Sequence, residues 1–320
     1  IVTEFRRVLF RSRVVLVTGA NSGLGYETSR VLAAKGARVI MACRDGNRAK
    51  AAWERIRKDT PSAELDILQI DLASMESIMG AAESYRNRFD RLDLLINSAG
   101  IMAPPRSETE EGFEVQFGVN HLGHFALTGL LLPLLLRTSG SRVVTVTSTA
   151  HKFGRINFED LQSRGEYRRY RAYGQSKLAN LLFALELNRR LGAAGNDTLS
   201  VAAHPGLAAT TLQERTASAT ASRLEGAIYT AMHYVISQSA EMGALPQLYA
   251  ATGSRVEGGA LYGPEWLQTR GYPVKVRPSR AAASWESARK LWRVSEELTG
   301  VHYGLPLPPS RPRGGRYSTM

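Results

Sequence analysis

The chain has 320 residues, of which 43% are hydrophobic and 22% are charged. This length and apolar content suit one large α/β domain with a substantial core, and they exclude an intrinsically disordered chain. A single cysteine, Cys43, excludes a disulfide framework and a multi-cysteine metal site. The longest apolar run, residues 130–136, is too short to span a bilayer, so we expect a cytoplasmic protein without a transmembrane segment.

The chain is basic, with 41 lysine and arginine residues against 29 acidic residues and a formal net charge of +12. Nucleic-acid binding proteins often cluster basic side chains and interleave them with aromatic ones. In the body of the chain only Arg164–Arg171 (RGEYRRYR) has this pattern. We interpret it as a solvated basic loop and predict no nucleic-acid partner. Salt-dependent binding of DNA would contradict this interpretation.

The two ends of the chain differ in composition from its body. Residues 4–12 (EFRRVLFRS) back-translate to a common sequencing-adapter sequence, so we expect residues 1–12 to be a non-native or disordered leader. Residues 304–320 are rich in proline, glycine and arginine, which is typical of a disordered tail. We therefore predict a single catalytic domain over residues 13–303.

Short apolar strands alternate with helical segments along the body of the chain. In chain order, the apolar runs predict strands over residues 13–17, 38–42, 65–70, 92–96, 142–147, 199–203 and, more briefly, 260–262. Between and after them, the apolar spacing predicts helices that begin near residues 24, 47, 74, 111, 170 and 284 and end near residues 36, 58, 89, 136, 191 and 298.

Repeated strand–helix units with continuously apolar strands are typical of a parallel sheet. We predict an α/β fold, a Rossmann-type doubly wound parallel sheet of about seven strands with helices on both faces. In such sheets ligands bind at the carboxyl ends of the strands, near the point where the strand order reverses. The polar motifs described next all fall at strand ends or on the helices just after them. They are therefore expected to form one site.

A glycine-rich loop, TGANSGLG over residues 18–25, follows the first predicted strand and opens a helix. Glycines permit tight turns and let backbone N–H groups approach a pyrophosphate, and the start of the helix adds a favourable dipole. Because the loop lies between a strand and a helix, it predicts a dinucleotide site rather than a merely structural turn. The expected contacts are Gly19, Asn21, Ser22, Gly23, Leu24 and Gly25.

The end of the second strand indicates which dinucleotide binds. An NAD site usually offers a carboxylate to the ribose hydroxyls at this place, but here the sequence reads ACRD over residues 42–45. Cys43 cannot replace a carboxylate, whereas Arg44 can pair with a 2′-phosphate. We therefore predict that NADP(H) is preferred over NAD(H). The rival interpretation is that Asp45, one position further on, serves the ribose.

Tyr173 and Lys177 lie four residues apart in a predicted helix, so their side chains share one face. A free tyrosine, with a pKa of about 10, is a poor base at neutral pH. A nearby ammonium favours the phenolate, so the phenol can give or take a hydroxyl proton while a hydride moves. Ser148, just past the fifth strand, could bind the carbonyl oxygen. This combination predicts a catalytic site.

At this point the chain resembles the short-chain dehydrogenase/reductase family, and within it the retinol-dehydrogenase-like branch. The resemblance covers roughly residues 13–303. It is carried by the strings LVTGANSGLG, ACRD, LLINSAGIM, VNHLGHFALT, VTSTAH, AYGQSKLANLLF and HPG. The resemblance implies four catalytic residues, which are Asn120, Ser148, Tyr173 and Lys177. Asn120 would hold a helix kink and a water linked to Lys177, which makes a proton path.

The resemblance also implies further cofactor contacts. Asp71 and Leu72 would bind near the adenine, and Asn97, Ala99 and Gly100 would back the adenine ribose. Tyr173 and Lys177 would contact the cofactor as well as catalyse. Beside the nicotinamide amide and the phosphates, the resemblance places Pro205, Gly206 and Thr210.

We thus predict an NADP(H)-dependent oxidoreductase that interconverts an alcohol with its aldehyde or ketone. The alternative is an NADP(H)-sensing binding protein of the same fold with little turnover. We expect a hydrophobic substrate, a possible homodimer or homotetramer, and no metal, because His121 and His124 have no third ligand and suit packing or supporting roles. The substrate pocket is expected to be built by residues 103–110, 155–169 and 207–223, the last as a lid or a disordered loop.

Overall fold

The computed structural model describes residues 10–207 and 238–308. Residues 1–9 of the predicted leader, most of the predicted lid, Thr210, and residues 309–320 of the predicted tail lie outside the described residues. Within the predicted leader, Phe10 is buried in the core, and its N–H donates to the carbonyl oxygen of Lys35 at 2.8 Å. Phe10, which belongs to the predicted leader, therefore packs on the domain.

One sheet forms the centre of the fold, and its strand order is β3-β2-β1-β4-β5-β6-β7-β8. All neighbouring strands are parallel except β7 and β8. The order reverses between β1 and β4, and this is where a ligand is expected. The strands are β1 (Val14–Thr18), β2 (Arg38–Cys43), β3 (Glu64–Gln69), β4 (Leu94–Asn97), β5 (Arg142–Val146), β6 (Leu199–Ala203), β7 (Leu261–Trp266) and β8 (Arg270–Val276).

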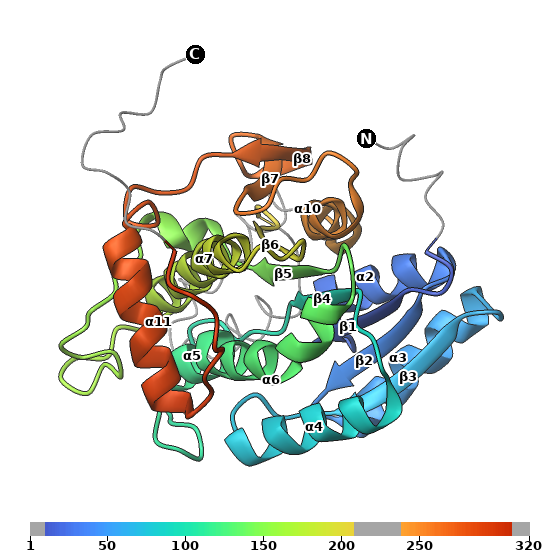
Figure 1. Ribbon diagram of the computed structural model, residues 1–320, viewed down its shortest axis with the longest axis horizontal. Helices are drawn as coiled ribbons and strands as arrows, with labels where there is room; N and C mark the ends of the chain where they lie inside the picture. Colours follow the sequence, from blue (N-terminus) through green and yellow to red (C-terminus); the bar gives the residue numbers. More distant parts are fainter. Residues whose placement is uncertain (1–9, 208–237, 309–320) are drawn as a thin grey trace, which may run out of the picture.

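Helices cover both faces of this sheet (Figure 1). Helices α2, α3 and α10 pack on one face, and α4, α6 and α7 pack on the other, with α11 lying against α7. The predicted fold class is confirmed. The helices are α2 (Gly23–Ala34), α3 (Gly46–Asp59), α4 (Met75–Arg88), α5 (Val115–Phe117), α6 (Gly123–Arg137), α7 (Arg169–Ala193), α10 (Ala240–Thr252) and α11 (Trp285–Thr299).

The central strands are apolar throughout because they face helices on both sides. In β1, Val15 and Val17 join the core under α2 and α3, whereas Leu16 joins the core under α4 and α6. All three side chains are fully buried. This two-sided burial is the reason that the sequence shows continuous apolar runs instead of an alternating pattern.

Strand β8 and helix α10 were not predicted. The sheet has eight strands where about seven were expected, because β8 forms an antiparallel edge against β7. Gly271 and Pro273 lie within β8, and both weaken a strand pattern but are tolerated at an edge. Helix α10 was also missed, since Pro246 lies inside it and proline usually marks a helix end.

The single long helix predicted over residues 111–136 is in fact divided. Helix α5 is followed by one π-helical turn, η1 (Gly118–Leu122), and then by α6. Such turns are rare and occur frequently at functional sites. The combined segment, Val115–Arg137, is long and apolar enough to cross a membrane by length and composition alone, but 78% of its apolar window is buried inside the domain. Its apolar side chains are therefore used for packing.

Candidate active site

A cavity of about 640 Å³ lies at the carboxyl edge of the sheet, where the ends of β1, β2, β4, β5 and β6 meet. Of the predicted site residues, Asn97 and Asn120 lie behind its wall, and Thr210 lies outside the described residues. The structure brings the others together around this one cavity. The predicted residues that line it are Gly19, Asn21, Ser22, Gly23, Leu24, Gly25, Arg44, Asp71, Leu72, Ala99, Gly100, Ser148, Tyr173, Lys177, Pro205 and Gly206.

The glycine loop forms one end of the cavity, and its glycines are required by space as well as by conformation. Gly19 has a φ of +68°, and a Cβ there would lie 3.0 Å from the Cα of Ala99. A Cβ on Gly25 would collide with the carbonyl oxygen of Gly19. Larger residues would therefore push the loop away from β4 and close the space beneath it.

The helix that follows the loop begins without a side-chain cap. Ser22 stands at the N-cap position of α2 but accepts no N–H from the first turn. In contrast, Asp45, Ser74, Ser239 and Ser284 cap α3, α4, α10 and α11 with their side chains. The first turn of α2 thus directs backbone N–H groups and the positive end of a helix dipole at the cavity. These features fit the pyrophosphate of a dinucleotide.

The end of β2 forms the end of the cavity where the adenosine is predicted to bind. Burial raises the pKa of the Cys43 thiol to about 11, so this side chain is neutral. Arg44 is exposed, and its one ion pair within the described part of the chain is a long contact, at 3.8 Å, with Asp71. Asp45 is engaged elsewhere, because its Oδ1 accepts the N–H of Arg48 at 3.0 Å and thereby caps α3. Arg48, which the sequence analysis did not single out, lines the same end.

The remaining predicted contacts near the adenine differ in their placement. Asp71 lines the cavity, and its Oδ1 accepts the N–H of Ala73 at 2.9 Å. Leu72 is buried beside it. Asn97 is also buried, but its Nδ2 donates to the Oγ1 of Thr128 at 3.0 Å, away from the cavity. Asn97 therefore supports the end of β4 from behind.

Tyr173 and Lys177 lie at the opposite end of the cavity, one turn apart on α7. The Lys177 Nζ is 5.8 Å from the centre of the Tyr173 ring and donates to the carbonyl oxygen of Val146 at 3.3 Å. Lys177 is buried, and it has no ion-pair partner among the residues that the structure describes. Burial lowers the pKa of Lys177 to about 8. A cation is thus held close to the phenol without a compensating carboxylate.

Asn120 lies in the π-helical turn η1, directly behind Gly100. Its Oδ1 accepts the N–H of Ile101 at 2.8 Å, and its Nδ2 donates to the Ile101 carbonyl oxygen at 2.9 Å and to the Ser176 Oγ at 3.0 Å. A Cβ on Gly100 would lie 3.1 Å from this Oδ1 and 3.3 Å from the Lys177 Nζ. The side chains of Asn120 and Lys177 therefore both lie close to Gly100.

Ser148 follows β5 and faces the same end of the cavity. Its Oγ accepts the N–H of Ala150 at 3.2 Å and so caps the short helix η2 (Thr149–Lys152). A hydroxyl that accepts a backbone N–H retains its own hydrogen for another partner. The Nδ1 of His151 lies 2.6 Å from the Ser148 carbonyl oxygen, which can only accept, so His151 donates and holds the turn. Ser148 is thus fixed as a hydrogen-bond donor into the cavity.

Thr18 and His124 connect the two ends of the site, and the sequence analysis gave neither a specific role. The Thr18 Oγ1 accepts the N–H groups of Ser98 and Ala99 at 2.9 and 3.0 Å. It also lies 2.9 Å from the His124 Nε2, while the His124 Nδ1 lies 3.0 Å from the Asn120 carbonyl oxygen. Burial lowers the pKa of His124 to about 4, so the ring is neutral.

The hydrogen-bond direction follows from these partners. The Asn120 carbonyl can only accept, so the His124 Nδ1 carries the hydrogen, and the Nε2 accepts from Thr18. The spacing of Asn120 and His124, four residues, was a signal of this contact, but the contact with Thr18 joins residues 106 positions apart. His121 instead contacts the Ser295 Oγ at 2.9 Å. In the described ranges no group of three or more possible metal ligands is found.

Comparison with known proteins agrees with this geometry. The family model of short chain dehydrogenases matches residues 13–221. Retinol dehydrogenase 14 of Mus musculus is 40% identical over 306 residues, which cover 92% of this chain and 87% of that protein. Polyprenol dehydrogenase of Mus musculus is 40% identical over 298 residues, with coverages of 91% and 85%.

A solved structure has a similar fold. The crystal structure of an uncharacterised protein from Mycobacterium paratuberculosis superimposes with a TM-score of 0.75 at 42% identity, covering 93% of this chain and 97% of that one. The predicted resemblance is therefore confirmed. This chain belongs to the short-chain dehydrogenase/reductase family of oxidoreductases, in its retinol-dehydrogenase-like branch.

Proposed function

We propose that this protein is an NADP(H)-dependent oxidoreductase that interconverts an alcohol with its aldehyde or ketone, with Tyr173 as the general acid and base. The observation that carries the proposal is the single cavity of about 640 Å³ that joins the glycine loop at one end to Ser148, Tyr173 and Lys177 at the other. When bound, the nicotinamide supplies or accepts the hydride. The loop and the uncapped start of α2 would hold its pyrophosphate.

The protein groups handle the proton. In reduction, Ser148 and Tyr173 donate hydrogen bonds to the substrate oxygen, which lowers the cost of the negative charge that develops there. Tyr173 then gives its proton to that oxygen, and the Lys177 cation favours the resulting phenolate. Asn120, held behind Gly100, donates to the Ser176 Oγ and so supports the turn of α7 that carries Lys177. In oxidation the same proton moves in the opposite direction.

The preference for NADP(H) is supported by the charges at the end of β2. Arg44 is weakly paired at 3.8 Å and can turn to a 2′-phosphate, and Arg48 lies in the first turn of α3 at the same end of the cavity. Asp45, the rival candidate for a ribose contact, already caps α3 and lies 3.4 Å from the Arg48 Nε. The contacts of Asp45 with Arg48 thus compete with a contact to ribose hydroxyls.

A hydrophobic substrate is supported by the wall between the catalytic residues and the mouth of the cavity. Its side chains are largely apolar, and Phe153 is 61% exposed at the rim. Relatives named as retinol and polyprenol dehydrogenases point in the same direction. The apolar residues of this wall are Ile101, Met102, Pro104, Pro105, Val115, Val119, Phe153 and Tyr170.

The proposal is tested by the absorbance of NADPH and NADH at about 340 nm against a panel of aldehydes and ketones that includes retinal. We expect NADPH-dependent reduction of apolar carbonyl compounds. Tight binding of NADPH with no turnover of any panel member would favour the cofactor-sensing alternative. A failure to bind either dinucleotide would overturn the proposal.

Replacement of Arg44 tests the choice of cofactor. We expect Arg44→Ala to weaken NADPH by about ten- to hundredfold, since a hydrogen bond between charged groups contributes about 1.5–3 kcal/mol. NADH, which lacks the 2′-phosphate, should change little and serves as the internal control. Titration of the protein with each dinucleotide, followed by nucleotide fluorescence, measures both affinities. An equal loss of affinity for NADPH and NADH would show that Arg44 does not bind the 2′-phosphate.

A further inference from the structure

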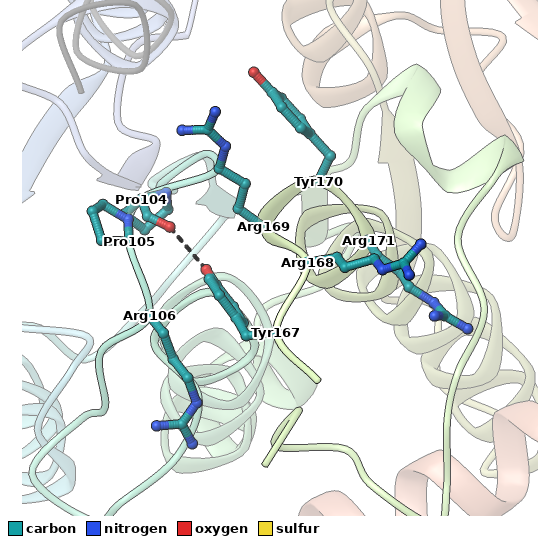
Figure 2. A pocket seen from close by; sticks show the side chains of 8 residues that line it. All are labelled: Pro104, Pro105, Arg106, Tyr167, Arg168, Arg169, Tyr170 and Arg171. Carbon is teal, nitrogen blue, oxygen red and sulfur yellow. Dashed lines mark hydrogen bonds between the residues drawn. The ribbon is translucent and has the colours of Figure 1, made fainter. Parts of the chain in front are cut away.

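A second cavity, of about 680 Å³, opens beside the mouth of the catalytic cavity. We call it the arginine pocket, and its lining is drawn in Figure 2. Pro104, Pro105 and Tyr170 line both cavities, so the arginine pocket adjoins the substrate end of the site. The residues that line it are Pro104, Pro105, Arg106, Tyr167, Arg168, Arg169, Tyr170 and Arg171.

The positive charge of this pocket is only partly compensated. Arg106 pairs with Glu108, and Arg168 pairs with Glu166, each at 2.8 Å. Within the described ranges, no carboxylate lies at ion-pair distance from Arg169 or Arg171. These arginines begin α7, which has no side-chain cap and no acidic residue in its first turn. Positive charge is unfavourable at the start of a helix, so an anion bound here would be stabilised.

Arg169 lines the arginine pocket and not the catalytic cavity, but it lies one helical turn before Tyr173. Arg169 and Tyr173 are four residues apart on α7, which places them on one face and about 6 Å apart along the helix axis. Arg171 is two residues from Tyr173 and therefore lies on the opposite side. Figure 2 shows Arg169 and Tyr170 on one side of the helix start, and Arg168 and Arg171 on the other.

The backbone around Arg169 is held in place by Gln116. The Gln116 Nε2 donates to the Arg169 carbonyl oxygen and to the Tyr167 Oη, both at 2.9 Å. Its Oε1 accepts the N–H of Ala103 at 2.8 Å, and the Tyr167 hydroxyl donates to the Pro104 carbonyl oxygen at 2.9 Å. One side chain thus ties the helix start to the opposite wall, so the position of Arg169 relative to the mouth is fixed before a ligand arrives.

We propose that Arg169 binds an anionic group at the end of the substrate that lies away from the reacting carbon. The substrates would then be amphiphiles, with a carbonyl or hydroxyl group at one end, an apolar chain along the wall from Ile101 to Tyr170, and a carboxylate or similar oxyanion at the other. This inference rests on the proposed function and adds a substrate class to it. Arg169 would act in substrate binding and specificity, without a role in proton transfer.

The first test measures binding alone. Calorimetry on the protein saturated with NADPH compares decanoate with decanol, which match in chain length and cannot be reduced. We expect Arg169→Gln to weaken decanoate about tenfold, equivalent to ~1.4 kcal/mol, and to leave decanol unchanged. Arg255→Gln removes the same charge from an exposed side chain that lines neither cavity, and it should change the binding of neither ligand. Equal effects of the two variants, or equal losses for both ligands, would overturn the proposal.

The second test measures turnover and separates this inference from the proposed function. With 10-oxodecanoic acid and its methyl ester, we expect Arg169→Gln to raise KM about tenfold for the acid alone, with kcat preserved. If neither compound is reduced but Arg169→Gln still weakens the binding of decanoate, the anion site is supported and the proposed activity is wrong. If both compounds are reduced and Arg169→Gln leaves the KM of each unchanged, the proposed activity is supported and Arg169 does not bind the anionic group of the substrate.

The anion could instead belong to a lipid headgroup. Sedimentation with phosphatidylglycerol vesicles distinguishes this source. We expect Arg169→Gln and Arg171→Gln to have the same small effect on vesicle binding, because an extended surface does not discriminate between the two faces of a helix start. A loss of vesicle binding confined to Arg169→Gln, with decanoate binding unchanged, would overturn the assignment of Arg169 to the substrate.

Discussion

Tyr173→Phe should abolish nearly all turnover while leaving cofactor binding intact. The substitution removes one hydroxyl and keeps the ring, which packs at 5.8 Å from the Lys177 Nζ. Without that hydroxyl, Ser148 remains to polarise the substrate oxygen, but no group delivers its proton. General acid catalysis contributes about 10²–10⁴-fold, so we expect kcat to fall by that factor. Steady-state kinetics with the best carbonyl substrate and NADPH measures the loss.

The matched control is Tyr272→Phe, which removes a hydroxyl from an exposed side chain on the edge strand β8. We expect its kcat to equal that of the wild type. Fluorescence titration with NADPH shows whether the Tyr173→Phe pocket still binds cofactor. If that variant binds NADPH normally and also keeps near-wild-type turnover, another group transfers the proton and the proposed mechanism is wrong.

Lys177→Met should inactivate the protein and at the same time stabilise its fold. Lys177 is buried without an ion pair in the described part of the chain, and burial lowers its pKa from 10.5 to about 8. Below pH 8 the lysine is charged in the folded and unfolded states, so the whole cost of burying the charge falls on the folded state. A shift of this size corresponds to a free energy on the order of 3 kcal/mol.

The stability gain of Lys177→Met should depend on pH in one direction. Between pH 8 and 10.5 the folded wild type binds fewer protons than the unfolded chain, so its stability rises with pH. The advantage of the methionine variant should therefore be largest at pH 7 and small at pH 10.5. Urea unfolding of the cofactor-free proteins at both pH values measures it.

Lys58→Met, which removes an exposed lysine from the last turn of α3, is the control. Its effect should stay within about 0.5 kcal/mol. A destabilised Lys177→Met at pH 7, with an unaffected control, would show that the ammonium is a favourable part of the folded state. That result would contradict the expectation that burying the Lys177 charge, which the proposed catalysis needs, destabilises the fold.

The parts of the site that could be predicted from the sequence are those encoded by short spacings. Tyr173 and Lys177 lie one helical turn apart, and the loop from Gly19 to Gly25 lies directly between a strand and a helix. Such patterns depend only on the helical period and on backbone sterics. The alternation of strands and helices fixed the fold class for the same reason.

What could not be predicted depends on contacts between distant segments. The bond from Asn120 to Ser176 joins positions 56 apart, and the one from Gln116 to Arg169 joins positions 53 apart. The π-helical turn also escaped prediction, because its residues keep the apolar pattern of an ordinary helix. Edge strand β8 was missed because strand pairing overrides the local effect of Gly271 and Pro273.

The neutral ring of His124 has a consequence for where this protein can work. Protonation would make both ring nitrogens donors, so the Thr18 hydroxyl would lose the His124 Nε2 as an acceptor and keep only the Ile96 carbonyl oxygen, 3.4 Å away, while Asn120 kept its contact. Because burial lowers the pKa of His124 to about 4, this rupture requires an acidity beyond that of the cytosol and of mildly acidic organelles. The hydrogen bond between Thr18, at the end of β1, and His124, beside the π-helical turn, is therefore expected to persist at the pH of each of these compartments.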